Sequence, residues 1–211
     1  IEKQGGLAIT LLNQALAIAR KEARGESLNL AEKLIDQALE RTIRKSIRAK
    51  FGGRLRAMVA GGAPLNPEVG IFFTAIGIPI LQGYGQTESG PVISCNRPRA
   101  KLKMHTVGPP LDQVEVKIAA DGEILVRGEL VMDGYWMNDA ESHKALKDGW
   151  LYTGDIGHLD KDGHLVITDR KKDIIVNDKG DNVAPQRVEG MLTLQDEIAQ
   201  AMVYGDKRPY L

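Results

Sequence analysis

Two adjacent side chains in the stretch GYGQTES, Thr87 and Glu88, place a hydroxyl and a carboxylate beside flexible glycine backbone. A carboxylate is a ligand that Mg²⁺ accepts, and hydroxyl and backbone N–H groups hold phosphate oxygens. The ring of Tyr84 is suited to covering a base. The same residues also fit an ordinary polar turn in which Thr87 caps a helix. The stretch alone leaves a phosphate site and a simple turn both open.

Two further segments carry groups that suit a sugar or an anion. Asp155, in GWLYTGDIG, follows an aromatic strand, where its carboxylate can accept two hydrogen bonds from a ribose diol or can close its own turn. Arg170, in DRKKD, carries a planar guanidinium that suits an anionic or sugar partner. A solvated hinge explains the same three cations, so both interpretations stay open.

The other reactive residue types suggest structural roles. Cys95 is the single cysteine, which rules out a disulfide or a thiolate cluster within the chain, and we expect it to be a packed small residue. The histidines show no metal-ligand spacing, so we expect them on the surface or in turns: His105, His143, His158 and His164. We expect Trp136 and Trp150 to make core or subdomain contacts.

Two helices are expected before the first strand. Residues 7–24 are rich in Ala and Leu, and residues 28–50 repeat apolar side chains every four positions before a Gly-Gly pair. Residues 1–56 hold 12 Lys+Arg against 6 Asp+Glu, although the whole chain is neutral. Residues 28–56 therefore form a candidate for peripheral contact with an anionic membrane, whereas a solvated charged face is the simpler interpretation. Without interleaved aromatic residues, nucleic acid is not an expected partner.

The middle of the chain alternates strand and helix. We expect a strand at 55–60, a helix at 68–77 and a strand at 78–82, which is the pattern of a βαβ unit in a parallel sheet. The segments GGAP and GYGQTES would then leave the carboxyl ends of adjacent strands, where such sheets bind ligands. This coincidence is the first sign of a site.

The remaining chain is expected to be mainly antiparallel. Asp121-Gly122 and Asp162-Gly163 are hairpin signals, and they predict a small antiparallel sheet or barrel with a short helix at 138–149. After DRKKD we expect a helix that starts near Pro185, flanked by strands at 173–185 and 197–206.

The composition is that of a soluble globular protein, with 43% hydrophobic and 27% charged residues in 211. No apolar run reaches the length of a membrane span, and no signal peptide is recognisable. The sequence therefore predicts a cytoplasmic location, with the inner face of a membrane as the surface that the basic helix would contact.

Five ordered motifs over about residues 55–195 together resemble one superfamily. The motifs of the adenylate-forming enzymes are similar to AGGAPL, GYGQTES, TVGPPL, GWLYTGDIG and DRKKDIIV…KGDNVAPQRVE. The residues of these motifs most resemble those of long-chain fatty acyl-CoA synthetases. The resemblance implies an α/β with α+β fold. Residues 1–104 would be a partial α/β subdomain, 105–168 a barrel-like antiparallel subdomain, and 169–211 the hinge and start of the small C-terminal domain.

The resemblance also implies a role for each matching residue. Thr87 would hold the α-phosphate, Glu88 the Mg²⁺, and Asp155 the ribose hydroxyls with help from Arg170. Lys172 would be the hinge of the small domain. One side of the adenine would be flanked by Gly61, Gly62, Ala63 and Pro64, and the other side by Tyr84 and Gly85. Gly180 would line the path of the pantetheine arm of CoA.

The implied reaction uses a fatty acid, ATP, Mg²⁺ and CoA to give acyl-CoA, AMP and pyrophosphate. The family's Ser/Thr/Gly-rich loop ending in Pro-Lys-Gly does not occur in the sequence, and its catalytic lysine would lie beyond Leu211. We therefore expect an internal fragment that is inactive alone. The alternatives are an acyl-AMP ligase or acyl-carrier-protein synthetase of the same superfamily, and a non-catalytic module that binds membrane surfaces.

Overall fold

The computed structural model describes residues 6–97, 102–176, 178, 182–195, 197–205 and 208. The chain forms two compact units, and each unit is made of two separate stretches of the sequence. The first unit is Ile1–Tyr84 with Cys95–Gly108, and the second is Gly85–Ser94 with Pro109–Leu211. The domain boundaries expected at 104/105 and 168/169 stay predictions. Among the described residues, no helix is both long enough and apolar enough to cross a membrane.

The first unit opens with the expected helices. Helix α1 spans Gly6–Ala23, and the second helical segment runs through α2 (Leu30–Leu39), a π-helical turn η2 (Glu40–Arg44) and α3 (Lys45–Lys50). Asn29 starts α2 with a reciprocal cap, because its side chain accepts from the Glu32 backbone while the Glu32 side chain accepts from the Asn29 N–H. These helices pack around one apolar core: Ala15, Ile18, Ala19, Leu39, Ile71, Ala75 and Met104.

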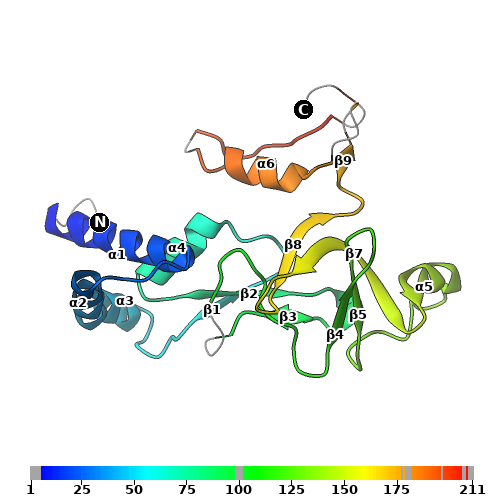
Figure 1. Ribbon diagram of the computed structural model, residues 1–211, viewed down its shortest axis with the longest axis horizontal. Helices are drawn as coiled ribbons and strands as arrows, with labels where there is room; N and C mark the ends of the chain where they lie inside the picture. The colour runs from blue at the N-terminus through cyan, green and yellow to red at the C-terminus, as the bar shows by residue number, and fades with distance from the viewer. Residues whose placement is uncertain are drawn as a thin grey trace. The chain divides into compact units, whose positions relative to one another are not determined.

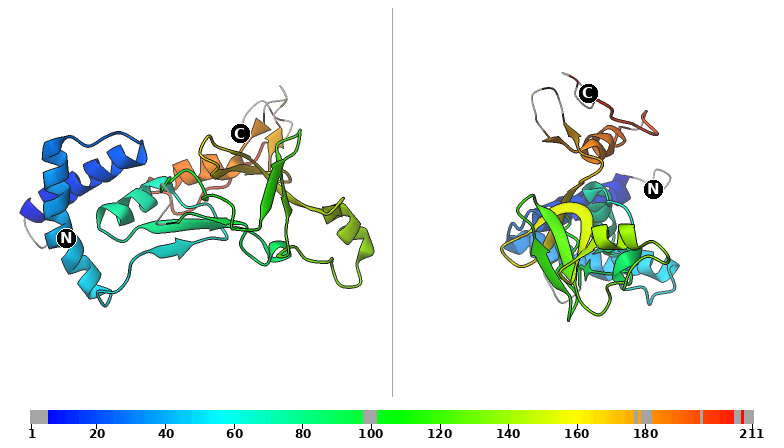
Figure 2. Two further views of the ribbon diagram at one scale, coloured as in Figure 1. Left: turned by 60° about the horizontal axis from the view of Figure 1, so that its bottom comes forward. Right: turned by 90° about the vertical axis from the view of Figure 1, so that its right-hand side faces the viewer.

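The expected βαβ unit is confirmed. Strand β1 (Met58–Ala60) and strand β2 (Ile80–Tyr84) pair in parallel, with Ala60 opposite Gln82. Helix α4 (Pro67–Ala75) connects them and lies along the strand pair in Figures 1 and 2. Asn66 begins α4 by accepting the Glu68 N–H at 2.9 Å. Strand β3 (Ser94–Cys95) continues the sheet in the order β1-β2-β3.

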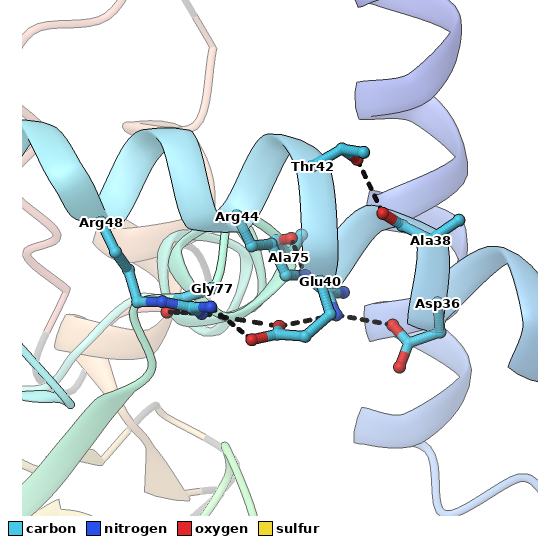
Figure 3. A network of polar contacts seen from close by, with 8 residues as sticks. All are labelled: Asp36, Ala38, Glu40, Thr42, Arg44, Arg48, Ala75 and Gly77. Carbon is cyan, nitrogen blue, oxygen red and sulfur yellow. Dashed lines mark hydrogen bonds and ion pairs between the residues drawn. The ribbon is translucent and has the colours of Figure 1, made fainter. Parts of the chain in front are cut away.

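Two arginines of the basic helix contact the end of α4, and Arg44 is buried there while Arg48 is half-buried (Figure 3). Arg44 is 8% exposed; its Nε donates to the Ala75 carbonyl at 2.9 Å and its Nη1 to Asp36 at 2.7 Å. Arg48 donates to the Gly77 carbonyl at 3.2 Å and pairs with Glu40. The last carbonyls of α4 carry the negative end of its dipole, which attracts both guanidinium groups. For Arg44 the interpretation as part of a solvated face is therefore wrong.

The second unit contains an antiparallel sheet of five strands: β4 (Glu115–Ile118), β5 (Glu123–Arg127), β6 (Leu146–Lys147), β7 (Trp150–Leu159) and β8 (Leu165–Arg170). The order is β4-β5-β7-β6, and β8 pairs with the second half of β7. Both expected hairpins are confirmed, and the described strands form an open sheet. The expected short helix is α5, Asp139–Ala145.

The last part of the chain has shorter elements than expected. Strands β9 (Ile175–Val176) and β10 (Asn182–Val183) form an antiparallel pair, and α6 (Pro185–Leu192) begins at the expected proline. The strand expected at 197–206 is wrong for its described residues, 197–205, which are irregular. The Val203 N–H donates to the Glu189 side chain of α6 at 2.8 Å instead of to a strand.

Candidate nucleotide-binding site

In the first unit, the candidate adenine residues lie at the carboxyl ends of β1 and β2. Gly61, Gly62, Ala63 and Pro64 form an exposed loop directly after β1, and Tyr84 is the last residue of β2. A Cβ added at Gly61 would lie 3.1 Å from the Gly83 carbonyl oxygen, so the two strand ends are adjacent.

The backbone of this loop is bare where a flat ring would approach it. Gly62 has a φ of +84°, in the left-handed region that favours glycine, and a Cβ added there would meet nothing within 4 Å. The carboxyl ends of parallel strands are where such sheets bind ligands. The loop therefore fits one wall of an adenine slot, and the role of its residues stays a prediction.

In the second unit, Gly85 has a packing reason to be glycine. A Cβ at this position would lie 2.0 Å from the Pro91 carbonyl oxygen and 2.9 Å from the Ile93 nitrogen. Thr87–Ser89 then form a single 3₁₀ turn, η3, in which Thr87 is exposed. The hydroxyl of the buried Ser89 donates to the Gln86 carbonyl at 2.9 Å and accepts the Gln86 N–H at 3.1 Å. This local bonding fixes the turn that presents Thr87 and Glu88.

Glu88 is held by a segment that sequence reasoning did not single out. The Tyr135 hydroxyl donates to Glu88 Oε1 at 2.8 Å, and the Met132 N–H donates to the Glu88 carbonyl at 2.9 Å. The hydrogen bond to the carboxylate raises the pKa of Tyr135. The partners are 47 residues apart, so no local signal could have revealed the contact.

A single carboxylate such as Glu88 suits Mg²⁺. This ion keeps several waters and takes one or two carboxylates together with substrate phosphates. Among the described residues there is no group of three His, Cys, Asp or Glu side chains that could hold a metal by themselves. Glu88 fits a magnesium ion that arrives with phosphates, and this assignment stays a prediction.

Asp155 and Arg170 meet across two strands, as their expected common task requires. They are register partners of β7 and β8, and Arg170 Nε donates to Asp155 Oδ1 at 3.2 Å. The Asp155 side chain is 7% exposed and the Arg170 side chain 62% exposed. A buried carboxylate beside an accessible guanidinium presents both an acceptor and a donor, which suits a sugar hydroxyl pair.

Two residues beside this pair were also missed, Glu123 and Lys171. Lys171 Nζ donates to Glu123 Oε2 at 2.8 Å and to Asp121 Oδ2 at 2.7 Å. Both hydrogen bonds raise the pKa of Lys171. The sequence shows a run of three cations in DRKKD. No feature of the sequence indicates that Lys171, among them, contacts carboxylates of the hairpin formed by β4 and β5.

The candidate hinge is only partly described. Lys172 is exposed in the turn that follows β8, and Gly180 lies outside the described residues. The sequence expectations for Cys95 and for Trp136 have different outcomes. Cys95 is half-buried, and desolvation raises the pKa of its thiol, as expected of a packed residue. Trp136 is 92% exposed, so the expectation of a core or subdomain contact is wrong.

Comparison with known proteins assigns the class. A model of the AMP-binding enzyme family matches residues 8–136, which is more than half of the chain. The chain therefore belongs to the family of AMP-binding enzymes.

Among individual relatives, the long-chain-fatty-acid–CoA ligase FadD15 of Mycobacterium bovis is 44% identical over 172 residues. That match covers 82% of this chain and 28% of the relative, so the chain spans little more than a quarter of that protein's length.

Solved structures agree with this class. The o-succinylbenzoate coenzyme A synthetase MenE of Bacillus subtilis, in complex with AMP, has a TM-score of 0.68 and 31% identity, covering 83% of this chain and 37% of that one. The amide bond synthetase McbA of Marinactinospora thermotolerans has a TM-score of 0.63 and 37% identity, covering 73% and 34%. The fold of the chain is therefore that of adenylate-forming enzymes.

Proposed function

We propose that the whole protein in which this chain occurs activates a long-chain fatty carboxylate with ATP and transfers the acyl group to CoA. The carboxylate oxygen attacks the α-phosphorus of ATP, and pyrophosphate leaves. The CoA thiol then attacks the acyl carbon, AMP leaves, and a thioester forms. The observation that carries this proposal is the 44% identity to a long-chain-fatty-acid–CoA ligase over 82% of the chain.

Each unit contains residues that are predicted to contact the nucleotide. Gly61, Gly62, Ala63 and Pro64 would contact one side of the adenine, where their exposed backbone allows a close approach, with Tyr84 and Gly85 on the other side. The bound AMP of the related MenE structure supports a nucleotide as the ligand. Asp155 would accept hydrogen bonds from the ribose hydroxyls, and Arg170 would donate to the sugar.

The first step needs charge neutralisation and in-line placement more than proton transfer. Thr87, exposed in its 3₁₀ turn, would donate its hydroxyl to the α-phosphate. Glu88 would hold Mg²⁺, which supplies positive charge against the phosphates; MenE has been solved with ATP and a magnesium ion. Lys172 would be the hinge about which the small C-terminal domain rotates between the two half-reactions. Gly180 would adjoin the pantetheine arm of CoA.

The decisive experiment supplies the whole protein with palmitate, ATP, Mg²⁺ and CoA. We expect palmitoyl-CoA and AMP to form in equal amounts, and AMP release to depend on CoA. AMP release that is indifferent to CoA would favour an acyl-AMP ligase or transfer to a carrier protein. Failure to form any acyl-adenylate, measured by pyrophosphate exchange with ATP, would contradict the proposal.

The 211-residue chain alone should not catalyse that exchange. Its sequence contains no Ser/Thr/Gly-rich loop ending in Pro-Lys-Gly that would hold the β- and γ-phosphates. Pyrophosphate exchange above background by the isolated chain would overturn this expectation.

Membrane contact through residues 28–56 is a second candidate, and exposed leucines on α2 favour it. Leu30 is 81% exposed and Leu34 is 68% exposed, on either side of the exposed Lys33. Apolar and cationic side chains on one helix suit an anionic lipid surface. Flotation of the chain with anionic but not neutral liposomes is the expected result, and equal flotation with both would remove the electrostatic part of the proposal.

A further inference from the structure

A closed set of polar contacts joins β7, the residue that follows β8, and the hairpin formed by β4 and β5. Glu123 Oε1 accepts the Gly154 N–H at 2.9 Å, and Glu123 Oε2 accepts from Lys171 Nζ at 2.8 Å. The Lys171 N–H donates to the Gly154 carbonyl at 2.8 Å. Lys171 Nζ also donates to Asp121 Oδ2, whose other oxygen accepts the Glu123 N–H at 3.2 Å. Each member therefore contacts at least two others.

Burial makes the central pair of this set sensitive to the loss of either member. The Glu123 side chain is 7% exposed, whereas the Lys171 side chain is 49% exposed. A carboxylate removed from water costs free energy unless it is paired and hydrogen-bonded. Lys171 supplies the charge and Gly154 supplies the N–H donor, so both Glu123 oxygens have partners inside the fold.

The contacts hold the Gly154 peptide from both sides, one residue before Asp155. Glu123 accepts its N–H, and the backbone of Lys171 donates to its carbonyl. Gly154 has a φ of +74°, in the left-handed region, and because glycine has access to many backbone conformations, these contacts select one of them. Thr153 continues the restraint, because its hydroxyl donates to the Ile124 carbonyl at 2.7 Å and accepts the Asp155 N–H at 3.1 Å.

The same contacts also fix the other member of the candidate sugar site. Lys171 directly follows Arg170, and Arg170 is the register partner of Asp155. Any shift of the Lys171 backbone away from Gly154 would change the 3.2 Å approach of Arg170 to Asp155. Neither Glu123 nor Lys171 needs to contact a ligand to exert this effect.

We propose that Glu123 and Lys171 are positioning residues that set the orientation of the Asp155–Arg170 pair and thereby the affinity for the nucleotide sugar. The inference rests on the proposed function, in which this pair binds the ribose. It assigns to the first lysine of DRKKD a task distinct from that of Lys172. It also explains why a glutamate occupies a strand position where all four residues of 123–126 are buried.

The structural half of the proposal is tested on the 211-residue chain, independently of any activity. Amide hydrogen exchange at Gly154 is measured by NMR in the unchanged chain, Lys171→Met, Glu123→Gln and Lys171→Arg. Lys161→Met is the matched control, because Lys161 is exposed in the turn between β7 and β8. Exchange at Leu125 and Val126, which are buried in β5, reports whether each variant keeps its core.

Lys171→Met should speed Gly154 exchange about tenfold, because an unpaired Glu123 turns toward water and releases the Gly154 N–H. Glu123→Gln leaves no buried carboxylate charge behind, so this variant should fold. Its neutral amide oxygen accepts the Gly154 N–H more weakly than a carboxylate does, so Gly154 exchange should still be faster. Lys171→Arg should stay within about threefold of the unchanged chain. If Lys171→Met and Glu123→Gln both match Lys161→Met at Gly154, the proposal is overturned.

The functional half is tested by steady-state kinetics of the whole protein. A contact made equally in the ground state and transition state changes KM, so Lys171→Met should raise the KM for ATP about tenfold with kcat within about threefold. Lys171→Arg should restore most of that loss. A fall in kcat at unchanged KM would instead assign Lys171 to the hinge and overturn the proposal. Absence of adenylation in the unchanged protein would contradict the proposed function, while the exchange data still decide whether Glu123 and Lys171 hold Gly154.

Discussion

Two cationic side chains hold two different regions of the molecule by similar means. In the first unit, Arg44 pairs with Asp36 and donates to the carbonyl of Ala75. In the second unit, Lys171 pairs with Glu123, and its backbone N–H donates to the carbonyl of Gly154. Each of the two residues connects a carboxylate with a backbone carbonyl that lies far from that carboxylate in the sequence.

The difference between the two regions is what adjoins them. Arg44 contacts the carboxyl end of α4, whereas the glycine loop of the candidate site joins α4 at its other end, through Asn66. Lys171 adjoins Arg170 directly. We therefore expect the Arg44 contacts to govern stability and the Lys171 contacts to govern the candidate site, and the following variants separate the two effects.

Arg44→Met should give the largest effect. It leaves Asp36 without its cation and the Ala75 carbonyl without its donor, so the free energy of unfolding should fall by about 3 kcal/mol. The measurement is urea unfolding of the chain. Arg41→Met is the control, because Arg41 is exposed on the same helical segment, and it should change the value by less than about 0.5 kcal/mol. Equal losses in the two variants would show that the buried network adds nothing.

Gly85→Ala should follow, and it tests whether this glycine serves packing as well as the predicted adenine wall. A Cβ 2.0 Å from the Pro91 carbonyl oxygen forces backbone to move, which should cost about 2–3 kcal/mol of unfolding free energy. Gly62→Ala is the matched variant in open space, where only the positive φ opposes it, at about 1 kcal/mol. Thermal unfolding compares them, and the reverse order would contradict the packing account.

The sequence predicted well those features that depend on near neighbours. The β1–α4–β2 unit and the hairpins at Gly122 and Gly163 follow from local periodicity and turn chemistry, and all are present. The adjacency of Gly61 to Gly83 followed from the rule that parallel strands end at one edge. These are short-range consequences of backbone preference.

The contacts that the sequence did not reveal depend on distant partners. Arg44 was one of several cations on a basic helix, and only α4 distinguishes it from Arg41. Lys171 and Lys172 are chemically alike, and Glu123, 48 residues away, separates their tasks. Trp136 belongs to a residue type that is usually well covered, yet it is almost wholly exposed. Composition cannot report which side chains tertiary structure brings together.

Asp155→Asn should have the opposite effect to Arg44→Met: it should weaken nucleotide binding and leave the free energy of unfolding nearly unchanged. Loss of the carboxylate charge weakens hydrogen bonds to the ribose, so the KM for ATP of the whole protein should rise about tenfold. Because the isosteric amide leaves no buried charge behind and Arg170 stays largely exposed to water, the free energy of unfolding should change by less than about 1 kcal/mol. Asp162→Asn, in the exposed turn after β7, is the control for both measurements. An unchanged KM would remove Asp155 from the site.

Tyr135→Phe should have the smallest effect, because it removes one hydroxyl and keeps the ring. The lost hydrogen bond to Glu88 Oε1 lets that carboxylate sample other rotamers, so binding of Mg²⁺ with ATP becomes weaker. We expect the Mg²⁺ concentration for half-maximal adenylation to rise about threefold, with the rate at saturating Mg²⁺ nearly unchanged. Tyr204→Phe removes a hydroxyl from a tyrosine that is 64% exposed and should leave the Mg²⁺ dependence unaltered. Identical Mg²⁺ curves for both variants would mean that the turn at 87–89 orients Glu88 without the Tyr135 hydroxyl. The position of the candidate metal ligand would then depend on local backbone structure alone, as the position of the Gly61–Gly62 loop does.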